Sequence, residues 1–448
     1  MFTQVRSRTD PYQLYIGIEV VSSFVTAIAF TTAIVYRVRS GHLNPLQLVL
    51  LGTAVEISYL AMQLPSGVLA DLVSRRLCVI AGQFLEAVGI LMQGLSPHFG
   101  VQLTAQIPVG FGAALTFGAQ EAWLADETGT QQLTSVFLRA AQFALLGTLI
   151  GSMLSGALAL AGGEVPFLAG GGLLAAMALV LTWIMPETRF RPPARATRIG
   201  GVARDAWSGL TGQVGKTRRA MVAVPGLVLL LCFVFFVGMW SESFDRLWSA
   251  YLLKDISFPH AFGPDVVIWF SILAVVTTLL SLGSTEWAKR RTGRLGPGSI
   301  PPTLLVLTVV TALAVVLMAG TSAFILVIAA YLVVATLRPV FSPLVTGWVV
   351  GRVDSSVRAT ALSATDLFDS AGQIAGGPIV GAIGVLASVR AALLAGGAAL
   401  VPAAVLLAAA ARRAGQVGQQ GGGDLAGLGD VGQVGAAPDH PEAGTADG

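Results

Sequence analysis

The sequence predicts an all-α integral membrane protein with twelve transmembrane helices, arranged as two pseudo-symmetric six-helix bundles. Of the 448 residues, 54% are apolar and only 11% are charged, whereas soluble domains carry about 25% charged residues. Mean hydropathy is +0.75. Twelve apolar runs are long enough to cross a bilayer as a helix, which takes about 20 residues. A basic segment near the middle of the chain separates these runs into two sets of six.

Glycine, proline or charged residues interrupt the apolar sequence between successive runs. The first run follows Arg6 and Arg8 and lacks a small-residue cleavage site, so we expect it to be retained as a span. The predicted spans are 13–36, 45–70, 77–96, 101–125, 136–161, 165–185, 222–252, 264–288, 301–319, 322–350, 358–384 and 386–411. The predicted domains are an N-terminal bundle at 1–186, a basic linker at 187–221, a C-terminal bundle at 222–411 and a Gly- and Ala-rich disordered tail at 412–448.

The distribution of Lys and Arg predicts the orientation, because these residues are enriched in cytoplasmic loops. With the N-terminus inside, 21 of the 27 basic residues fall on the cytoplasmic side, eight of them between 187 and 219. Arg37, Arg39, Lys254 and Arg390 are then expected in outer loops. An even number of spans places both termini, the linker and the tail in the cytoplasm. The Ala-, Gly- and Arg-rich composition suggests a bacterial cytoplasmic (inner) membrane.

Glycines repeat between the two halves at one offset of 225 residues. Gly147, Gly151 and Gly156 in the fifth span correspond to Gly372, Gly376 and Gly381 in the eleventh. Small residues at this spacing allow helices to approach closely. The alternative is coincidence, because the chain contains 53 glycines. Two six-span repeats would suit a transporter whose halves rock about a central cavity.

Several classes of function lack the residues that they need. The net charge of +3 gives no basic surface for nucleic acid, and Cys78 and Cys232 lie far apart in apolar runs, where we expect buried thiols. Residues 427–432 fit a dinucleotide-binding pattern but lie in the tail without a preceding strand, and residues 209–217 lack the first glycine of a phosphate loop. The spans hold no His cluster, Cys pair or nucleophile constellation. We therefore expect neither an enzyme nor a protein that needs a cofactor or metal.

The loop between the second and third spans carries the most specific motif. Gly67, Asp71, Arg75 and Arg76 stand at the positions of the pattern Gly-x-x-x-Asp-basic-x-Gly-basic-basic, although Leu72 and Ser74 depart from it. On this motif the chain resembles the major facilitator superfamily over residues 10–411. The stretches 65–76, 120–127, 243–248 and 376–378 resemble its drug-efflux branch, which includes tetracycline and macrolide exporters.

The resemblance implies the major facilitator fold, transport by alternating access and a cytoplasmic gate at this loop. We expect the gate motif to comprise Gly67, Asp71, Arg75, Arg76, Asp126 and Glu127. Two features of proton-coupled exporters are missing: Gln106 stands where many have an arginine, and Gly156 is not followed by proline. These motifs therefore do not imply antiport.

Charged residues within spans are expected to face a cavity or a partner, because a charge at mid-membrane costs roughly 2.5–3.5 kcal/mol. In the family that the chain resembles, spans one, four, seven and ten surround the central cavity. The resemblance therefore favours the charged residues of these four spans as cavity residues. The candidates for proton coupling or cavity charge are Glu19, Glu121, Glu242, Asp245, Arg246, Arg338, Asp366 and Asp369, with Glu19 and Glu121 preferred for the proton; Glu56 and Glu86 are further charges inside spans. The alternative for each is a static ion pair or a side chain that reaches the membrane surface.

The spacing of these charges predicts local pairs. Glu242 and Arg246 are four residues apart and can pair on one helix, which leaves Asp245 in need of another donor. Asp366 and Asp369 share a helix face and cannot both ionise at low cost, so Arg338 is expected to neutralise one of them.

Export of amphipathic drug-like molecules, driven by protons, is the first functional hypothesis. Trp123, Trp240 and Phe244 would form aromatic walls of the substrate cavity, although aromatic residues also pack helices. The alternative is an uptake symporter for a small metabolite, which would need fixed polar anchors. We expect a small-molecule substrate, protons and membrane lipid as partners, no nucleic acid, and a monomer.

Overall fold

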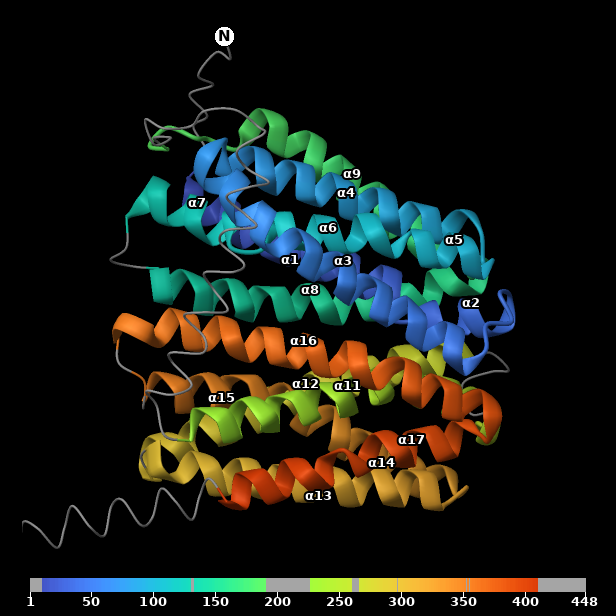
Figure 1. The fold of residues 1–448 in the computed structure, drawn as a ribbon. Coiled ribbons are helices and arrows are strands. Elements are labelled where there is room, and N and C mark those ends of the chain that lie inside the picture. The colour runs from blue at the N-terminus through green and yellow to red at the C-terminus, as the bar shows by residue number, and fades with distance from the viewer. Residues whose placement is uncertain are drawn as a thin grey trace, which may run out of the picture.

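The computed structural model describes residues 10–129, 133–190, 226–259, 266–295, 297–351, 353 and 355–409. These residues form helices joined by short connections and contain no strand (Figure 1). The predicted linker, apart from residues 187–190, lies outside the described residues, as do the predicted tail and the basic residues Arg6 and Arg8.

The N-terminal half contributes six membrane-spanning stretches, of which the first and the fourth are divided into shorter helices. Its helices are α1 (Pro11–Phe30), α2 (Ala33–Arg39), α3 (Pro45–Leu72), α4 (Arg75–Leu95), α5 (Phe99–Thr104), α6 (Gln106–Thr116), α7 (Ala119–Thr128), α8 (Leu133–Ala161) and α9 (Val165–Ile184). Each of the six predicted spans of this half therefore corresponds to one helical stretch.

The C-terminal half repeats this organisation, with the tenth span divided. Its helices are α11 (Leu227–Asp255), α12 (Val266–Leu295), η1 (Pro297–Ser299), α13 (Ile300–Gly320), α14 (Phe324–Leu337), η2 (Arg338–Val340), α15 (Phe341–Val350), α16 (Ser355–Leu386) and α17 (Val389–Ala398). After a turn at Ala399, a further helix at 400–409 continues the path of α17.

Ten of the helical stretches within the described ranges are long and apolar enough to cross a membrane by length and composition. The other two predicted spans are α5–α7, which contains Glu121, Asp126 and Glu127, and α16, which contains Asp366 and Asp369. The chain is a multi-pass membrane protein of twelve spans in two six-helix bundles.

Local sequence explains where these helices begin and break. Asn44 and Gln47 form a capping box at the start of α3, and the Ser74 hydroxyl accepts a hydrogen bond from the Leu77 amide at the start of α4. Gly118 has φ +76°, which ends the path of α6 and begins α7. Pro339 follows Arg338 in a 3-10 turn because proline has no N–H to continue the α-helical hydrogen bonds.

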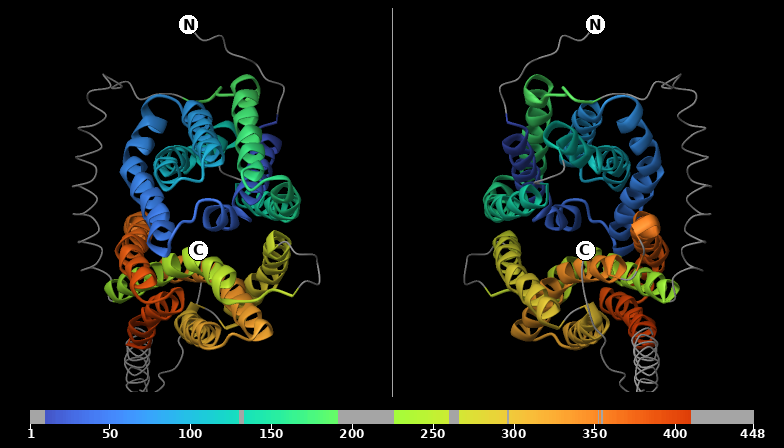
Figure 2. Two further views of the ribbon diagram at one scale, coloured as in Figure 1. Left: turned by 90° about the vertical axis from the view of Figure 1, so that its right-hand side faces the viewer. Right: turned by 90° about the vertical axis from the view of Figure 1, so that its left-hand side faces the viewer.

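The two halves lie side by side and meet along two pairs of helices (Figure 2). α3 packs against α16 and α11 of the other half, and α8 packs against α12. We name the two ends of the bundle by α3: the Pro45 side, where α3 begins, and the Arg75 side, where α3 ends and α4 begins.

The α3–α16 seam is sealed on the Pro45 side by glycines. A Cβ added at Gly384 would lie 2.6 Å from the Pro45 Cβ, and one at Gly381 would lie 3.0 Å from the Leu46 Cα. Residues of both halves, including Val35, Val49, Leu247 and Tyr251, also share one buried apolar cluster there. The absence of side chains at the glycines allows α3 and α16 to approach closely.

The glycine repeat read from the sequence has the same role in both halves. Gly147 and Gly151 of α8 pack against the backbone of α1 at Val20 and Phe24. Gly372 and Gly376 of α16 pack against α11 at Phe235 and Met239. In the same way, Gly156 meets Ser271 of α12 and Gly381 meets Leu46 of α3, so each reaches the opposite half. The repeat is therefore structural and reflects the pseudo-symmetry of the bundles.

Candidate functional site

A cluster of charges lies on α11 and η2, where the C-terminal half faces the other half. The predicted pair on α11 is present: Arg246 Nε lies 3.2 Å from Glu242 Oε1, and the Glu242 side chain is only 1% exposed. Arg338 of η2 forms an ion pair with Asp245. The expectation that Arg338 neutralises Asp366 or Asp369 is therefore corrected, because the break at Pro339 directs Arg338 toward α11.

The charge cluster touches the N-terminal half directly. A Cβ added at Gly52 of α3 would overlap both the Glu242 carboxylate and the Arg246 guanidinium, so a side chain at this position would displace the pair. One turn along α3, Glu56 Oε2 accepts a hydrogen bond of 3.1 Å from the Ser370 hydroxyl of α16. The ion pair and Glu56 thus lie at the junction between the halves.

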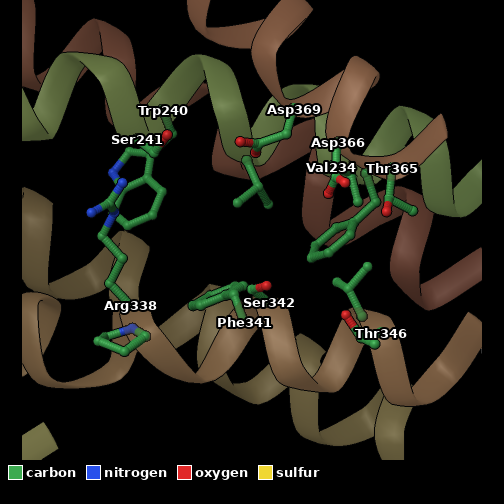
Figure 3. A pocket seen from close by; sticks show the side chains of 14 residues that line it. Val234, Trp240, Ser241, Arg338, Phe341, Ser342, Thr346, Thr365, Asp366 and Asp369 are labelled. Carbon is green, nitrogen blue, oxygen red and sulfur yellow. The ribbon is translucent and has the colours of Figure 1, made fainter. Parts of the chain in front are cut away.

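An acidic cavity of about 420 Å³ lies beside this cluster, between α11, α15 and α16 (Figure 3). Asp366 and Asp369 line one wall, and Phe341, Ser342 and Thr346 line the facing wall. Asp369 accepts a hydrogen bond of 2.7 Å from Gln373, and no ion pair to either carboxylate occurs within the described ranges. Arg338 also lines this cavity and acts electrostatically on Asp369, but its ion pair is with Asp245.

Aromatic side chains form the inner wall of the acidic cavity. The ring of Trp240 lies 5.9 Å from Phe244 and 6.3 Å from Phe341, measured between centroids. Trp240 is 1% exposed, and its indole nitrogen has no hydrogen-bond partner in the described part of the chain. Phe244 stacks in turn on Tyr331, 6.2 Å away. Of the two aromatic residues predicted here, Trp240 lines the cavity and Phe244 supports it from behind.

A second cavity, of about 530 Å³, lies between the halves and is lined mainly by hydroxyl groups. We call it the hydroxyl cavity. Its lining residues are Ser22, Ser23, Thr26, Ala27, Phe30, Thr31, Thr148, Ser152, Ala274, Thr277, Thr278 and Tyr331. Because these residues come from α1 and α8 on one side and from α12 and α14 on the other, relative movement of the halves would change its shape.

The N-terminal candidates lie apart from the α11 charges. Glu19 of α1 is half-buried and accepts a hydrogen bond of 2.8 Å from Gln120 of α7. Glu121 is exposed on α7. Trp123 is 1% exposed in a core cluster of this half, and its indole donates to the Pro186 carbonyl. The structure therefore places Trp123 in helix packing and not at either cavity.

The gate motif forms a network within the N-terminal half on the Arg75 side. Arg75 lies 2.6 Å from Asp126 and 3.3 Å from Asp71, and it donates to the Ala122 carbonyl. Arg76 donates to the Thr182 carbonyl. Gly67 has open space where a side chain would be, so no close approach requires glycine there.

The segment that follows α9 completes this network through residues that the motif did not indicate. Glu187 accepts hydrogen bonds from the Ser74 hydroxyl at 2.6 Å and from the Arg76 amide at 3.0 Å. Glu127, expected near the arginines, instead accepts hydrogen bonds from Thr188 and from the Arg189 amide. The loop after α3 thus contacts the first residue of the predicted linker, Glu187.

Arg37 was expected in an outer loop, and the structure corrects this. It lies in α2, is 8% exposed, and donates to Gln93 at 2.5 Å and to Gln102 at 3.2 Å. The sequence hides this site because Arg37 follows a break in the first helix, and its partners are neutral amides from α4 and α5. Glu56 and Ser370 were equally hidden, since only the packing of α3 on α16 brings them together.

Comparison with solved structures shows the fold. The nucleoside transporter NupG has a TM-score of 0.69 at 14% identity, with 89% of this chain and 98% of that chain covered. A bacterial homolog of the human lysosomal transporter Spinster, inward-facing and unoccupied, has a TM-score of 0.70 at 15% identity, covering 90% and 98%. A POT family transporter in complex with a thioalcohol-conjugated peptide has a TM-score of 0.65 at 13% identity, covering 88% and 95%.

Sequence comparison gives the family. No curated protein sequence matches the chain. A family profile described as Major Facilitator Superfamily matches residues 16–365, which is well over half of the chain. The chain therefore belongs to the major facilitator superfamily and is a transporter.

Proposed function

We propose that this protein is a proton-coupled secondary transporter that exports amphipathic drug-like molecules by alternating access. The observation that supports this most is the acidic cavity, which Asp366 and Asp369 line together with the aromatic residues Trp240 and Phe341. Carboxylates next to an aromatic face suit a ligand with a positive group on an apolar body, because both attract the cation.

The arrangement of the halves supports a state that is closed on the Pro45 side. Contacts at Pro45, Leu46 and Val49 seal α3 against α16 there, whereas Asp366, toward the Arg75 side, is exposed. By the distribution of Lys and Arg, the Arg75 side is cytoplasmic. A transporter in this state would take up its substrate from the cytoplasm, as an exporter must.

Proton coupling is supported by the balance of charges at the junction of the halves. Five carboxylates lie in the seam and the acidic cavity, but only two arginines, Arg246 and Arg338, pair with them. The carboxylates are Glu56, Glu242, Asp245, Asp366 and Asp369. Because unneutralised charge is expensive in a membrane, binding of protons is the simplest compensation. This favours the α11 region over Glu19 and Glu121 as the site of coupling.

Uptake of a small polar metabolite is the alternative, and the hydroxyl cavity favours it. Ser22, Thr148 and Thr277, among others, offer donors and acceptors from both halves, which suits a neutral polar ligand. The similar structures include transporters described for nucleosides and peptides, and these fit uptake as well as efflux.

The gate network completes the proposed cycle. We propose that Asp71, Arg75 and Arg76 hold the cytoplasmic side closed when the outer side opens. The protein would act as a monomer in a bacterial inner membrane, with both termini in the cytoplasm. Its partners would be the small-molecule substrate, protons and surrounding lipid.

A compound panel in proteoliposomes with an imposed pH gradient tests the proposal. Inside-out membrane vesicles should accumulate amphipathic cations when their lumen is acidified. Replacement of both cavity carboxylates, Asp366→Asn with Asp369→Asn, should abolish this accumulation, while the lipid-facing variant Gly172→Ala should retain it. Accumulation of nucleosides or other neutral metabolites, and of no cation, would favour the uptake alternative.

A further inference from the structure

Glu56 occupies a special position on the face of α3 that meets the other half. Going along α3, Pro45, Leu46, Val49 and Thr53 each face a glycine of α16, and Glu56 follows them at the same spacing. Where the earlier residues meet glycines, Glu56 meets the Ser370 hydroxyl at 3.1 Å. Glu56 is therefore a carboxylate that follows apolar and hydroxyl-bearing residues along this face of α3.

The sealed part of the seam ends at this pair. Ser370 is buried and Glu56 is half-buried, whereas Asp366, one turn toward the Arg75 side on α16, is exposed and lines the acidic cavity. Glu56 thus lies between the closed contacts of the Pro45 side and the open space of the cavity. A proton on Glu56 could leave toward the cavity but not toward the Pro45 side while the seam is closed.

The charged residues of α11 near Glu56 are already engaged in ion pairs with other residues. On α11, Arg246 and Asp245 act on it electrostatically, but Arg246 is paired with Glu242 and Asp245 with Arg338 of η2. On α16, Asp366 and Asp369 add further negative charge, and Tyr59 is the titratable neighbour on α3. Within the described ranges, the contact partner of Glu56 is the neutral Ser370, and no ion pair to Glu56 is present.

Closure of the seam must then depend on the charge of Glu56. An ionised carboxylate loses hydration when α3 and α16 come together, and one serine hydroxyl replaces little of it. A protonated carboxyl has no such penalty and still forms a hydrogen bond with Ser370, because a hydroxyl can accept as well as donate. Protonation and closure therefore stabilise each other, as linked equilibria require.

We propose that Glu56 is the proton-binding residue that couples the proton gradient to closure of the Pro45 side. It takes a proton from water while that side is open, enters the seam in the neutral form, and releases the proton to water in the acidic cavity. This inference rests on the proposed proton-coupled transport. It adds which carboxylate moves the proton and which contact that proton controls.

Distance measurements between spin labels test this without any substrate. Labels at His42→Cys and Ala387→Cys, both exposed on the Pro45 side of opposite halves, report closure in a background from which Cys78 and Cys232 have been removed. In liposomes, the wild-type distance distribution should shift toward the closed state as pH falls. Glu56→Gln should remain closed at all pH values, with loss of the pH response.

Glu86→Gln is the matched control. Glu86 is also a carboxylate within a span, but it packs on Gly112 between α4 and α6 of the N-terminal half and touches no residue of the seam. This variant should keep the full pH response. A pH response that survives Glu56→Gln, or that Glu86→Gln abolishes equally, would overturn the assignment of Glu56 while leaving proton coupling intact.

Ser370→Ala provides a second variant should Glu56→Gln fail to fold. It removes the hydrogen bond across the seam without changing charge, so the midpoint of the pH response should move to lower pH. An unchanged midpoint would overturn the proposal. Absence of any pH response in the wild-type protein would instead refute proton-coupled transport itself, and the inference with it.

Discussion

Gly381→Ala is expected to open the seam between the halves, and its effect can be worked out from the packing. The added Cβ would lie 3.0 Å from both the Cα and the Cδ1 of Leu46, and 3.4 Å from the Val49 Cβ. Contacts of 3.0–3.4 Å require the neighbour to move by a few tenths of an ångström. The Leu46 Cα is backbone, so α3 as a whole must shift.

The energy of that shift sets the size of the effect. Overpacking of a tight interface costs about 1–3 kcal/mol, and only the closed state contains this contact. The ratio of closed to open molecules should therefore fall roughly 5- to 150-fold. Spin labels at His42→Cys and Ala387→Cys would detect this as growth of the longer distance.

Gly172→Ala is the control for this experiment. Gly172 is exposed on α9, and a Cβ added there meets nothing within 4 Å. This variant should leave the distribution unchanged. An unchanged distribution in Gly381→Ala, or an equal change in both variants, would refute the assignment of the seam as the closed gate.

Three further predictions concern other parts of the molecule. Gln102→Leu should lower stability by about 1–3 kcal/mol, because it leaves the buried Arg37 guanidinium short of an acceptor; thermal unfolding in detergent should show this, and Arg37→Met with Gln102→Leu together should recover much of the loss. Arg75→Gln should lower stability by about 1 kcal/mol through loss of the contact with Asp126, whereas Arg290→Gln, at an exposed pair with Glu286, should have no measurable effect. Asp369→Asn should weaken binding of amphipathic cations about tenfold in a fluorescence titration and leave neutral compounds unaffected, while equal weakening of both would exclude a charge-specific role.

The fold could be predicted from the sequence because lipid imposes simple requirements. Apolar runs of about 20 residues between charged loops indicate spans, and each predicted span corresponds to a helical stretch. The breaks within spans were harder to see. The break at Pro339 has a recognisable cause, but the one between α1 and α2 falls at Thr31 and Thr32, which give no strong signal for the end of a helix.

Parts of the candidate site that lie on one helix were also predictable. Glu242 and Arg246 pair because residues four apart share a face, and this needs no knowledge of packing. Asp126 and Arg75 lie on different helices, but they too were expected to meet, because their spans end at the same membrane surface.

Contacts between distant helices could not be predicted in this way. Pairing of Glu56 with Ser370 depends on the rotation of α3 against α16, and burial of Arg37 depends on how α2 meets α4 and α5. Trp123 shows why the span alone does not place a side chain. An aromatic residue in a span expected to line the cavity can face the core instead, because a helix presents several faces.

Proton movement driven by a substrate gradient tests the proposed transport most directly. Liposomes that contain the protein and a trapped pH-sensitive dye are given an outward or inward gradient of an amphipathic cation. If the protein exchanges protons for substrate, the lumen pH should change because protons cross the membrane in the direction opposite to the compound. Glu56→Gln should abolish this proton movement. Protons moving with the compound would indicate uptake by symport, and movement of the compound without any proton flux would contradict proton coupling.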